Sequence, residues 1–204
     1  MNWKRPIFLV LGFVIWLASV IAGMSMLRTY SLTPSVAGTP GLRWPVASQI
    51  VPRAGYFTLV MAIHPHCPCS RASIGELAIL MAQNHRRLAA SVIFVEPPGF
   101  GASWTKSDLW SSAGLIPGVS RIIDRGGEAN LFGAATSGQT MVYDGRGRLL
   151  FSGGITAARG HFGDNAGVSA IVALTETPAS ARLAQTAVYG CPLFAPSGRG
   201  STMN

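Results

Sequence analysis

Two histidines and two cysteines stand close together in the segment H-P-H-C-P-C-S, residues 64–70. Cys67 and Cys69 are separated by Pro68 alone, and the third cysteine of the chain is Cys191. The thiolate form of cysteine is a nucleophile and also a ligand for soft metal ions. The segment therefore suits either disulfide exchange or metal binding. A set of buried, inert thiols is the plainer alternative.

The cysteine segment lies where a predicted strand gives way to a predicted helix. Residues 55–63, G-Y-F-T-L-V-M-A-I, are rich in β-branched and aromatic types and indicate a buried strand. Apolar residues recur at helical spacing over residues 70–86. The start of a helix favours negative charge, and His64 and His66 would help if they were protonated or donated hydrogen bonds. We therefore expect Cys67 to be the nucleophile.

Further strands and helices alternate after this junction. Strands are predicted over 90–97 and 120–124, a hairpin over 139–154, and helices over 103–115 and 164–174. The order β-α-β-α-β-β-α is typical of an α/β domain. Open α/β sheets place their sites at strand-to-helix junctions, which is where the cysteine segment falls.

Two stretches carry a resemblance to a known family. Residues 67–77, C-P-C-S-R-A-S-I-G-E-L, match the pattern W-C-P-P-C-R-A-E-x-P-E-L of membrane-anchored periplasmic thioredoxins of the TlpA/ResA type, and residues 124–149 are similar to that family's second conserved region. The chain thus resembles the thioredoxin superfamily over about residues 55–175. The resemblance implies a thioredoxin-like α/β fold, with a central mixed sheet flanked by helices. It also implies a thiol-disulfide oxidoreductase that acts on protein cysteines.

Two of the family's working residues are replaced in this chain. The resemblance places Cys67 on the nucleophilic cysteine, but Ser70 stands in the place of the resolving cysteine and Gly138 in that of the cis-proline. We expect six residues to shape the site around the thiols: His64, His66, Pro68, Ser70, Ser137 and Gly138.

Because Ser70 cannot resolve a mixed disulfide, another thiol has to do so. A bridge between Cys67 and Cys69 would close a small strained ring, which would make it oxidising. Cys191 would avoid that strain, but a terminal tail would have to become ordered. We expect Cys67 and Cys69 to be the working pair, with Cys191 as the other candidate for the resolving role.

Two alternatives to an oxidoreductase stay open at this point. Cys67, Cys69, His64 and His66 offer ligands that copper(I) and zinc accept, so a metal chaperone of the same fold is one of them. Copper chaperones of the Sco type need C-x-x-x-C and a histidine in the loop before the hairpin, and neither is present here. A non-catalytic binding module is the other alternative. An oxidoreductase of this kind needs no cofactor, whereas a metal chaperone would bind copper.

An apolar segment precedes the predicted domain. Residues 7–27 carry no charge and are long enough to cross a membrane as a helix, and Lys4 and Arg5 before them favour a cytoplasmic N-terminus. We therefore expect a single-pass anchor in the inner membrane, with the rest of the chain in the periplasm. A cleaved signal peptide is the alternative.

The predicted organisation has five parts: a cytoplasmic N-terminus (1–6), the anchor (7–27), a linker (28–50), a thioredoxin-like domain (51–178) and a C-terminal tail (179–204). The net charge of +8 comes from scattered basic residues, which argues against a nucleic-acid partner. The expected partners are thiols and disulfides of periplasmic proteins, together with the inner membrane.

Overall fold

The protein divides into two units in this computed structural model, which describes residues 4–125, 127–177 and 182–194. One unit ends at Thr33 and the other begins at Pro34. The first unit is helix α1 (Lys4–Leu32), which continues past the span predicted over 7–27. Its most apolar window has a mean hydropathy of 2.6 and is not buried, so α1 is long and apolar enough to cross a membrane.

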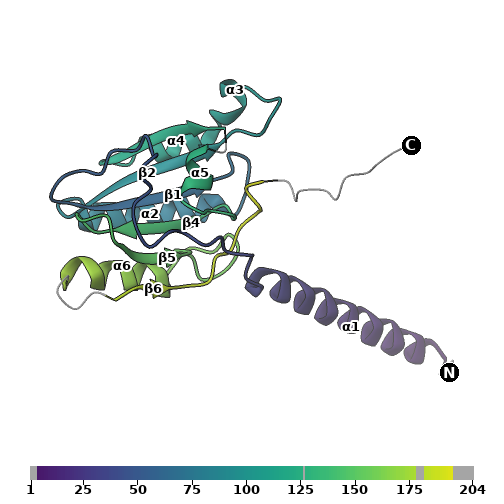
Figure 1. Ribbon diagram of the computed structural model, residues 1–204. Coiled ribbons are helices and arrows are strands. Elements are labelled where there is room, and N and C mark those ends of the chain that lie inside the picture. Colours follow the sequence, from purple (N-terminus) through teal and green to yellow (C-terminus); the bar gives the residue numbers. More distant parts are fainter. Residues whose placement is uncertain (1–3, 126, 178–181, 195–204) are drawn as a thin grey trace. The chain divides into compact units, whose positions relative to one another are not determined.

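The second unit is built on a six-stranded mixed sheet in the order β3-β2-β1-β4-β5-β6 (Figure 1). β1 is parallel to β2, and β2 to β3, whereas β4 is antiparallel to both β1 and β5. The short β6 is parallel to β5. The strands are β1 (Phe57–Ile63), β2 (Leu88–Val95), β3 (Val119–Asp124), β4 (Gln139–Tyr143), β5 (Leu149–Gly153) and β6 (Ala184–Gln185).

Helices pack on both faces of this sheet because its central strands are apolar on both sides. In β1, Leu59 and Met61 belong to the core cluster that includes side chains of α2 (Ser70–Asn84), α4 (Asp108–Gly114) and α6 (Ala166–Glu176). Val60 and Ala62 point the other way, as alternate strand residues do, and pack in a second cluster with α5 (Gly127–Leu131). This arrangement is the expected α/β fold with a central mixed sheet flanked by helices.

The region predicted as one helix over 103–115 contains two helices. These are α3 (Ala102–Thr105) and α4, and Ser107 between them accepts a hydrogen bond from the N–H of Trp110 at the start of α4. A serine at that position satisfies an N–H group that the first turn leaves unpaired, so it starts a new helix. The short helix α5 was not foreseen from the sequence.

Residues 34–50 belong to the domain, whereas the sequence predicts a linker over 28–50. The Gln139 side chain pairs with both backbone groups of Gly38, at 2.8 Å from its N–H and 2.9 Å from its carbonyl oxygen. The Trp44 ring packs edge-on against Phe132 and Tyr143. The linker prediction is wrong for this stretch because Trp44 and Ile50 pack on the core although the stretch has no periodic apolar pattern.

The C-terminal segment also belongs to the domain, whereas the sequence predicts a boundary at 178 and a tail after it. β6 extends the sheet, and Leu193 is buried in the core cluster that contains α5. Residues 178–181 and 195–204 of the predicted boundary and tail lie outside the described residues. The described part of the tail returns to the loop that precedes β4, and this brings Cys191 to the cysteine segment.

Candidate active site

The candidate site forms where β1 ends and α2 begins. Cys69 is the N-cap residue of α2, and the N–H of Ser70 donates to the carbonyl oxygen of Cys67 at 3.0 Å. Cys67 therefore stands in the turn that leads directly into the helix, as the sequence predicts. Its side chain is buried, with 2% of its surface exposed, and Cys69 is 9% exposed.

The sulfur atom of Cys191 is in contact with that of Cys67. The two Sγ atoms are 2.8 Å apart, and the Cys67 thiol donates a hydrogen bond to Cys191. When Cys67 ionises, the direction reverses and the Cys191 thiol donates to the Cys67 thiolate. All three cysteines are free thiols in this structure. We expected Cys69 to be the working partner, and its thiol also interacts with Cys67, but the contact of 2.8 Å is the one with Cys191. The geometry favours Cys191 instead.

The hydrogen bonds at the site separate the three thiols by acidity. Burial raises the pKa of Cys67, but hydrogen bonds from the side chains and N–H groups of Cys191 and Ser70 outweigh it, so the net shift is downward. Burial and the donated hydrogen bond raise the pKa of Cys191 to about 12. Burial and the neighbouring Cys67 charge raise the pKa of Cys69. Cys67 is thus the thiol that ionises first.

Two buried serines support the Cys67 sulfur. The Ser70 and Ser137 hydroxyl oxygens are 2.6 Å apart, and Ser137 Oγ accepts a hydrogen bond from the N–H of His64 at 2.7 Å. Since Ser70 lowers the pKa of Cys67 by donating its hydroxyl proton, Ser137 must donate to Ser70. The serine in the resolving position therefore stabilises the thiolate.

Gly138 occupies the predicted cis-proline position with a left-handed backbone, at φ +90°. Its N–H donates to the carbonyl oxygen of Ala62 at 2.8 Å, which ties the loop to the end of β1. A Cβ atom here would come within 2.8 Å of the Ser73 hydroxyl. The left-handed backbone favours glycine here, and proline could not adopt it because its ring fixes φ near about −65°.

The described part of the C-terminal tail lies antiparallel to the loop before β4 and is joined to it by an isolated β-bridge. The N–H of Ser137 donates to the carbonyl oxygen of Cys191 at 2.8 Å, and the N–H of Leu193 donates to that of Ala135 at 2.9 Å. Thr136 and Pro192 form an antiparallel bridge between these two hydrogen bonds. The pairing fixes Cys191 and covers Cys67.

The two histidines contact Trp104. The His66 ring lies 4.4 Å from the Trp104 ring and its Nε2 is 2.9 Å from the Trp104 carbonyl oxygen, while the His64 ring lies 5.5 Å from the indole edge-on. Burial, followed by the charge of His66, lowers the pKa of His64, so His64 is neutral at pH 7. Both rings therefore contact Trp104. We expected the histidines to stabilise the Cys67 thiolate, but the groups that lower its pKa are hydroxyl, thiol and N–H donors.

Among the described residues, no group of three or more His, Cys, Asp or Glu side chains is placed to hold a metal ion. The ligands of the alternative copper site, Cys67, Cys69, His64 and His66, therefore do not converge in this structure. Pro68, between the two cysteines, is exposed.

Sequence reasoning missed Arg159, which adjoins the thiols from the loop after β5. Its Nη1 donates to the carbonyl oxygen of Gly190 at 2.6 Å, and its positive charge acts on Cys69 and Cys191, opposing the rise in their pKa values. No local pattern distinguishes this arginine, because its contacts depend on the path of the tail. His161 nearby is exposed and its ring contacts the Arg159 carbonyl oxygen at 2.7 Å.

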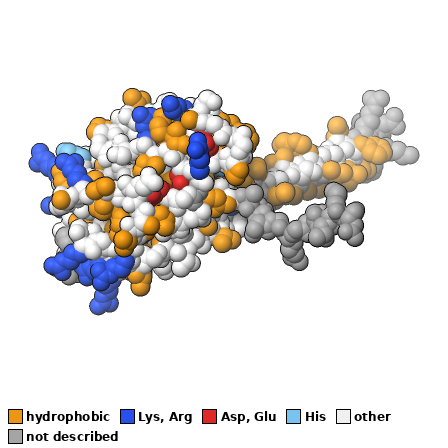
Figure 2. Space-filling model, turned by 45° about the horizontal axis from the view of Figure 1, so that its top comes forward, with side chains coloured by type: hydrophobic (Ala, Val, Ile, Leu, Met, Phe, Trp, Pro, Cys, Tyr) orange, Lys and Arg blue, Asp and Glu red, His pale blue; other side chains and the backbone are white. Residues whose placement is uncertain are grey.

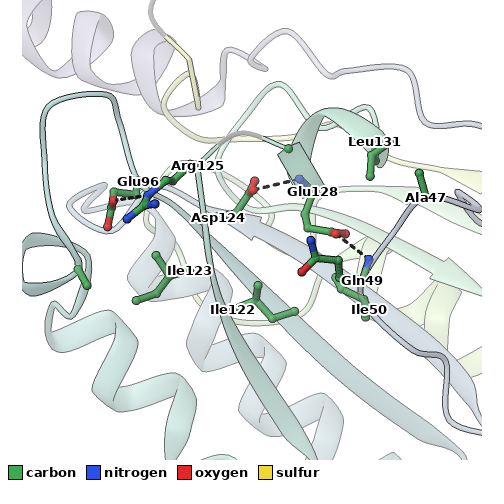
Figure 3. A pocket seen from close by; sticks show the side chains of 12 residues that line it. Ala47, Gln49, Ile50, Glu96, Ile122, Ile123, Asp124, Arg125, Glu128 and Leu131 are labelled. Atoms are coloured by element: carbon green, nitrogen blue, oxygen red, sulfur yellow. Dashed lines mark hydrogen bonds and ion pairs between the residues drawn. The ribbon is translucent and has the colours of Figure 1, made fainter.

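A cavity of about 680 Å³ lies away from the thiols, between the segment around Ile50 and the end of β3 (Figure 3). Its carboxylates all have hydrogen-bond donors. Asp124 accepts from the N–H groups of Glu128 and Ala129 at the start of α5. Glu128 accepts from the 48–49 segment, and Glu96 pairs with Arg125. These acids therefore hold the loops in place.

The basic side chains form several separate groups on the face shown in Figure 2, with few acidic ones between them. The whole chain has 16 lysine and arginine residues against 8 acidic ones. This distribution differs from the continuous basic stripe that binds a nucleic-acid backbone.

Comparison with solved structures finds chains of similar fold. A hypothetical protein from Sinorhizobium meliloti 1021 matches with a TM-score of 0.57 at 18% identity, over 82% of this chain and 97% of that one. An uncharacterized conserved protein from Geobacillus kaustophilus matches with a TM-score of 0.56 at 17% identity, over 82% and 95%. The exposed lipoprotein thioredoxin of Streptococcus pneumoniae strain TIGR4 matches with a TM-score of 0.41 at 15% identity, over 60% and 84%.

These matches concern the fold alone, and we draw nothing from the third because its TM-score is below 0.5. No protein-family model matches the chain, and no curated protein does. The topology itself has a parallel β1-α2-β2 unit, a following antiparallel hairpin and a last helix on one mixed sheet. With the cysteine at the start of α2, this is a thioredoxin-like fold, as the sequence predicts.

Proposed function

We propose that the protein is a membrane-anchored thiol-disulfide oxidoreductase that acts on cysteines of other proteins outside the cytoplasm. The observation that carries the proposal is the contact of 2.8 Å between the Sγ atoms of Cys67 and Cys191. One of these thiols has a lowered pKa and the other a raised one, which gives a nucleophile and a partner held in reserve. Buried cysteines that serve packing alone need no such asymmetry.

In the first step the Cys67 thiolate attacks a disulfide of the partner protein. The Cys67 sulfur forms a bond to one partner sulfur, the partner's S–S bond breaks, and the other sulfur leaves as a thiolate. The product is a mixed disulfide between Cys67 and the partner. Ser70 and Ser137 stabilise the attacking anion before this step.

The second step uses Cys191. Once Cys67 is in a mixed disulfide it carries no charge, so both the repulsion and the hydrogen bond that raise the pKa of Cys191 disappear. Cys191 then loses its proton and attacks Cys67 Sγ, and the second partner sulfur leaves and takes up a proton. The partner disulfide has gained two electrons, and the protein now holds a Cys67–Cys191 disulfide. The reverse sequence oxidises a partner dithiol.

The N-terminal helix supports a location at a membrane. Helix α1 has the length and composition of a membrane span, and Lys4 and Arg5 before it favour an N-terminus on the cytoplasmic side. We propose the inner membrane, with the thioredoxin-like domain in the periplasm, where protein disulfides form and persist.

Trapping of mixed disulfides tests the assignment. The full chain in detergent is reacted with a disulfide-containing protein, as the unsubstituted protein and as the Cys191→Ala and Cys69→Ala variants. Cys191→Ala should accumulate a mixed disulfide on Cys67, whereas Cys69→Ala should turn over like the unsubstituted protein. Accumulation in Cys69→Ala instead would make Cys69 the resolving thiol, and no adduct in either variant would favour a binding module.

A further inference from the structure

Arg159 joins three segments that are far apart in the sequence. It lies half-buried in the loop between β5 and α6. Its Nη1 donates to the carbonyl oxygen of Gly190 at 2.6 Å, and its Nη2 donates to Ser35 Oγ at 2.9 Å. One planar side chain thus holds both the tail and the segment that begins the domain.

Ser35 also binds the tail at Gly190. Its hydroxyl donates to the carbonyl oxygen of Gly190 at 2.7 Å and accepts from the N–H of Gly190 at 3.1 Å. Its own N–H donates to the carbonyl oxygen of Val188 at 2.8 Å. Both backbone groups of Gly190 are therefore held, and the carbonyl oxygen uses both of its lone pairs.

These hydrogen bonds hold Gly190, the residue directly before Cys191. On the other side of the tail, Ser137 holds the Cys191 carbonyl oxygen, and Gly190 lies so close to Ser137 that a Cβ atom would overlap the Ser137 carbonyl oxygen. Gly190 is thus fixed between Arg159 and the loop before β4. Because its neighbour Gly190 is fixed on both sides, Cys191 is held with its Sγ atom in contact with that of Cys67.

We propose that Arg159 is a positioning residue for thiol exchange, which holds Cys191 against Cys67 through Gly190 and Ser35. The proposal rests on the proposed function, in which Cys191 resolves the mixed disulfide. Arg159 serves the second step, because its hydrogen bonds go to Gly190 in the tail and to Ser35, which holds the same residue. Its loss should therefore slow resolution without slowing the first attack.

The two steps separate in the reaction with 5,5′-dithiobis(2-nitrobenzoate), a small disulfide that releases one coloured thiolate per step. The full chain in detergent carries Cys69→Ala, so that two thiols remain. The first release reports attack by Cys67, and the second reports resolution by Cys191. Arg159→Gln should slow the second release about tenfold, the size expected for the loss of a charged hydrogen bond, and leave the first unchanged or faster.

Two further variants separate the effect of the Arg159 charge from the effect of its hydrogen bonds to Gly190 and Ser35. Arg159→Lys keeps the charge and should recover part of the second rate. Ser35→Ala removes the hydroxyl link and keeps the charge, and it should slow the second release less than Arg159→Gln does. An unchanged second release in Arg159→Gln overturns the proposal, as does a change of both releases in the same direction, which would mean a purely structural role. If the Cys69→Ala protein with Arg159 intact shows no second release, the resolving role of Cys191 is refuted instead.

Discussion

The Sγ atoms of Cys67 and Cys191 lie 2.8 Å apart although 124 residues separate them in the sequence. The contact depends on the last described segment of the chain, which pairs with the loop before β4 and covers the start of α2. The reactive thiol is thereby buried and stabilised at once. A partner protein can reach Cys67 only when this segment moves.

The acidity of Cys67 should depend on its two side-chain donors. Because hydrogen bonds from Cys191 and Ser70 favour the thiolate and lower the pKa of Cys67, the midpoint of its alkylation should lie below that of a free cysteine. Cys191→Ala and Ser70→Ala should each raise that midpoint. The measurement is the pH dependence of iodoacetamide labelling, followed on the Cys67 peptide by mass spectrometry.

Ser120→Ala is the control for this series, because Ser120 is exposed on β3. It should leave the labelling midpoint of Cys67 where it is. The stated cause of the low pKa would be wrong if Ser70→Ala and Cys191→Ala titrated like the unsubstituted protein.

Displacing the tail should expose Cys67. In Gly190→Ala the new Cβ would overlap the carbonyl oxygen of Ser137, so the tail has to move away from the loop. Labelling of Cys67 at fixed pH should become faster, and resolution by Cys191 slower. Gly145→Ala is the matched control, since Gly145 lies in the hairpin turn with open space around its Cα. Equal labelling rates in the two variants would mean that the tail does not cover Cys67.

The segment after α1 should contribute to the stability of the domain. A Cβ at position 38 would overlap the carbonyl oxygen of Gly133, so Gly38→Ala should lower the free energy of unfolding by about 1–3 kcal/mol. Gly41→Ala adds a Cβ with ordinary contacts and should change it by no more than about 0.5 kcal/mol. Urea unfolding of the full chain in detergent gives both values. Similar values for the two variants would mean that this segment is a linker after all.

The N-terminal segment should stay attached and face the cytoplasm. Cell fractionation of a C-terminally tagged protein should recover the full-length chain in the membrane fraction, and the tag should be open to protease added to spheroplasts. A shortened chain in the soluble fraction would mean that α1 is a cleaved signal sequence. Protection of the tag from the protease would mean that the domain faces the cytoplasm.

The parts of the site that the sequence predicts are those set by local pattern. The strand over 55–63 and the helix from Ser70 have clear periodicity, so the place of Cys67 between them could be predicted. Ser70, Ser137 and Gly138 could be identified as site residues from the resemblance. Their hydrogen bonds could not, because these join segments separated by more than 60 residues.

The parts that the sequence does not predict depend on how the two ends of the domain pack. The segment before β1 has few periodic apolar residues, so nothing local indicates that Ser35 meets Gly190. The tail carries turn residues around Cys191 and reads as a loop, although it pairs with the 135–137 loop. Arg159 has a role only once both ends are in place, and this is why residue type and spacing gave no sign of it.

The map of disulfides in the oxidised protein tests the central claim most directly. The full chain is oxidised mildly in detergent, its free thiols are labelled at low pH, and the bridged peptides are identified by mass spectrometry without reduction. The contact at 2.8 Å predicts one bridge, between Cys67 and Cys191, with Cys69 labelled as a free thiol. A bridge between Cys67 and Cys69, with Cys191 labelled instead, would contradict it.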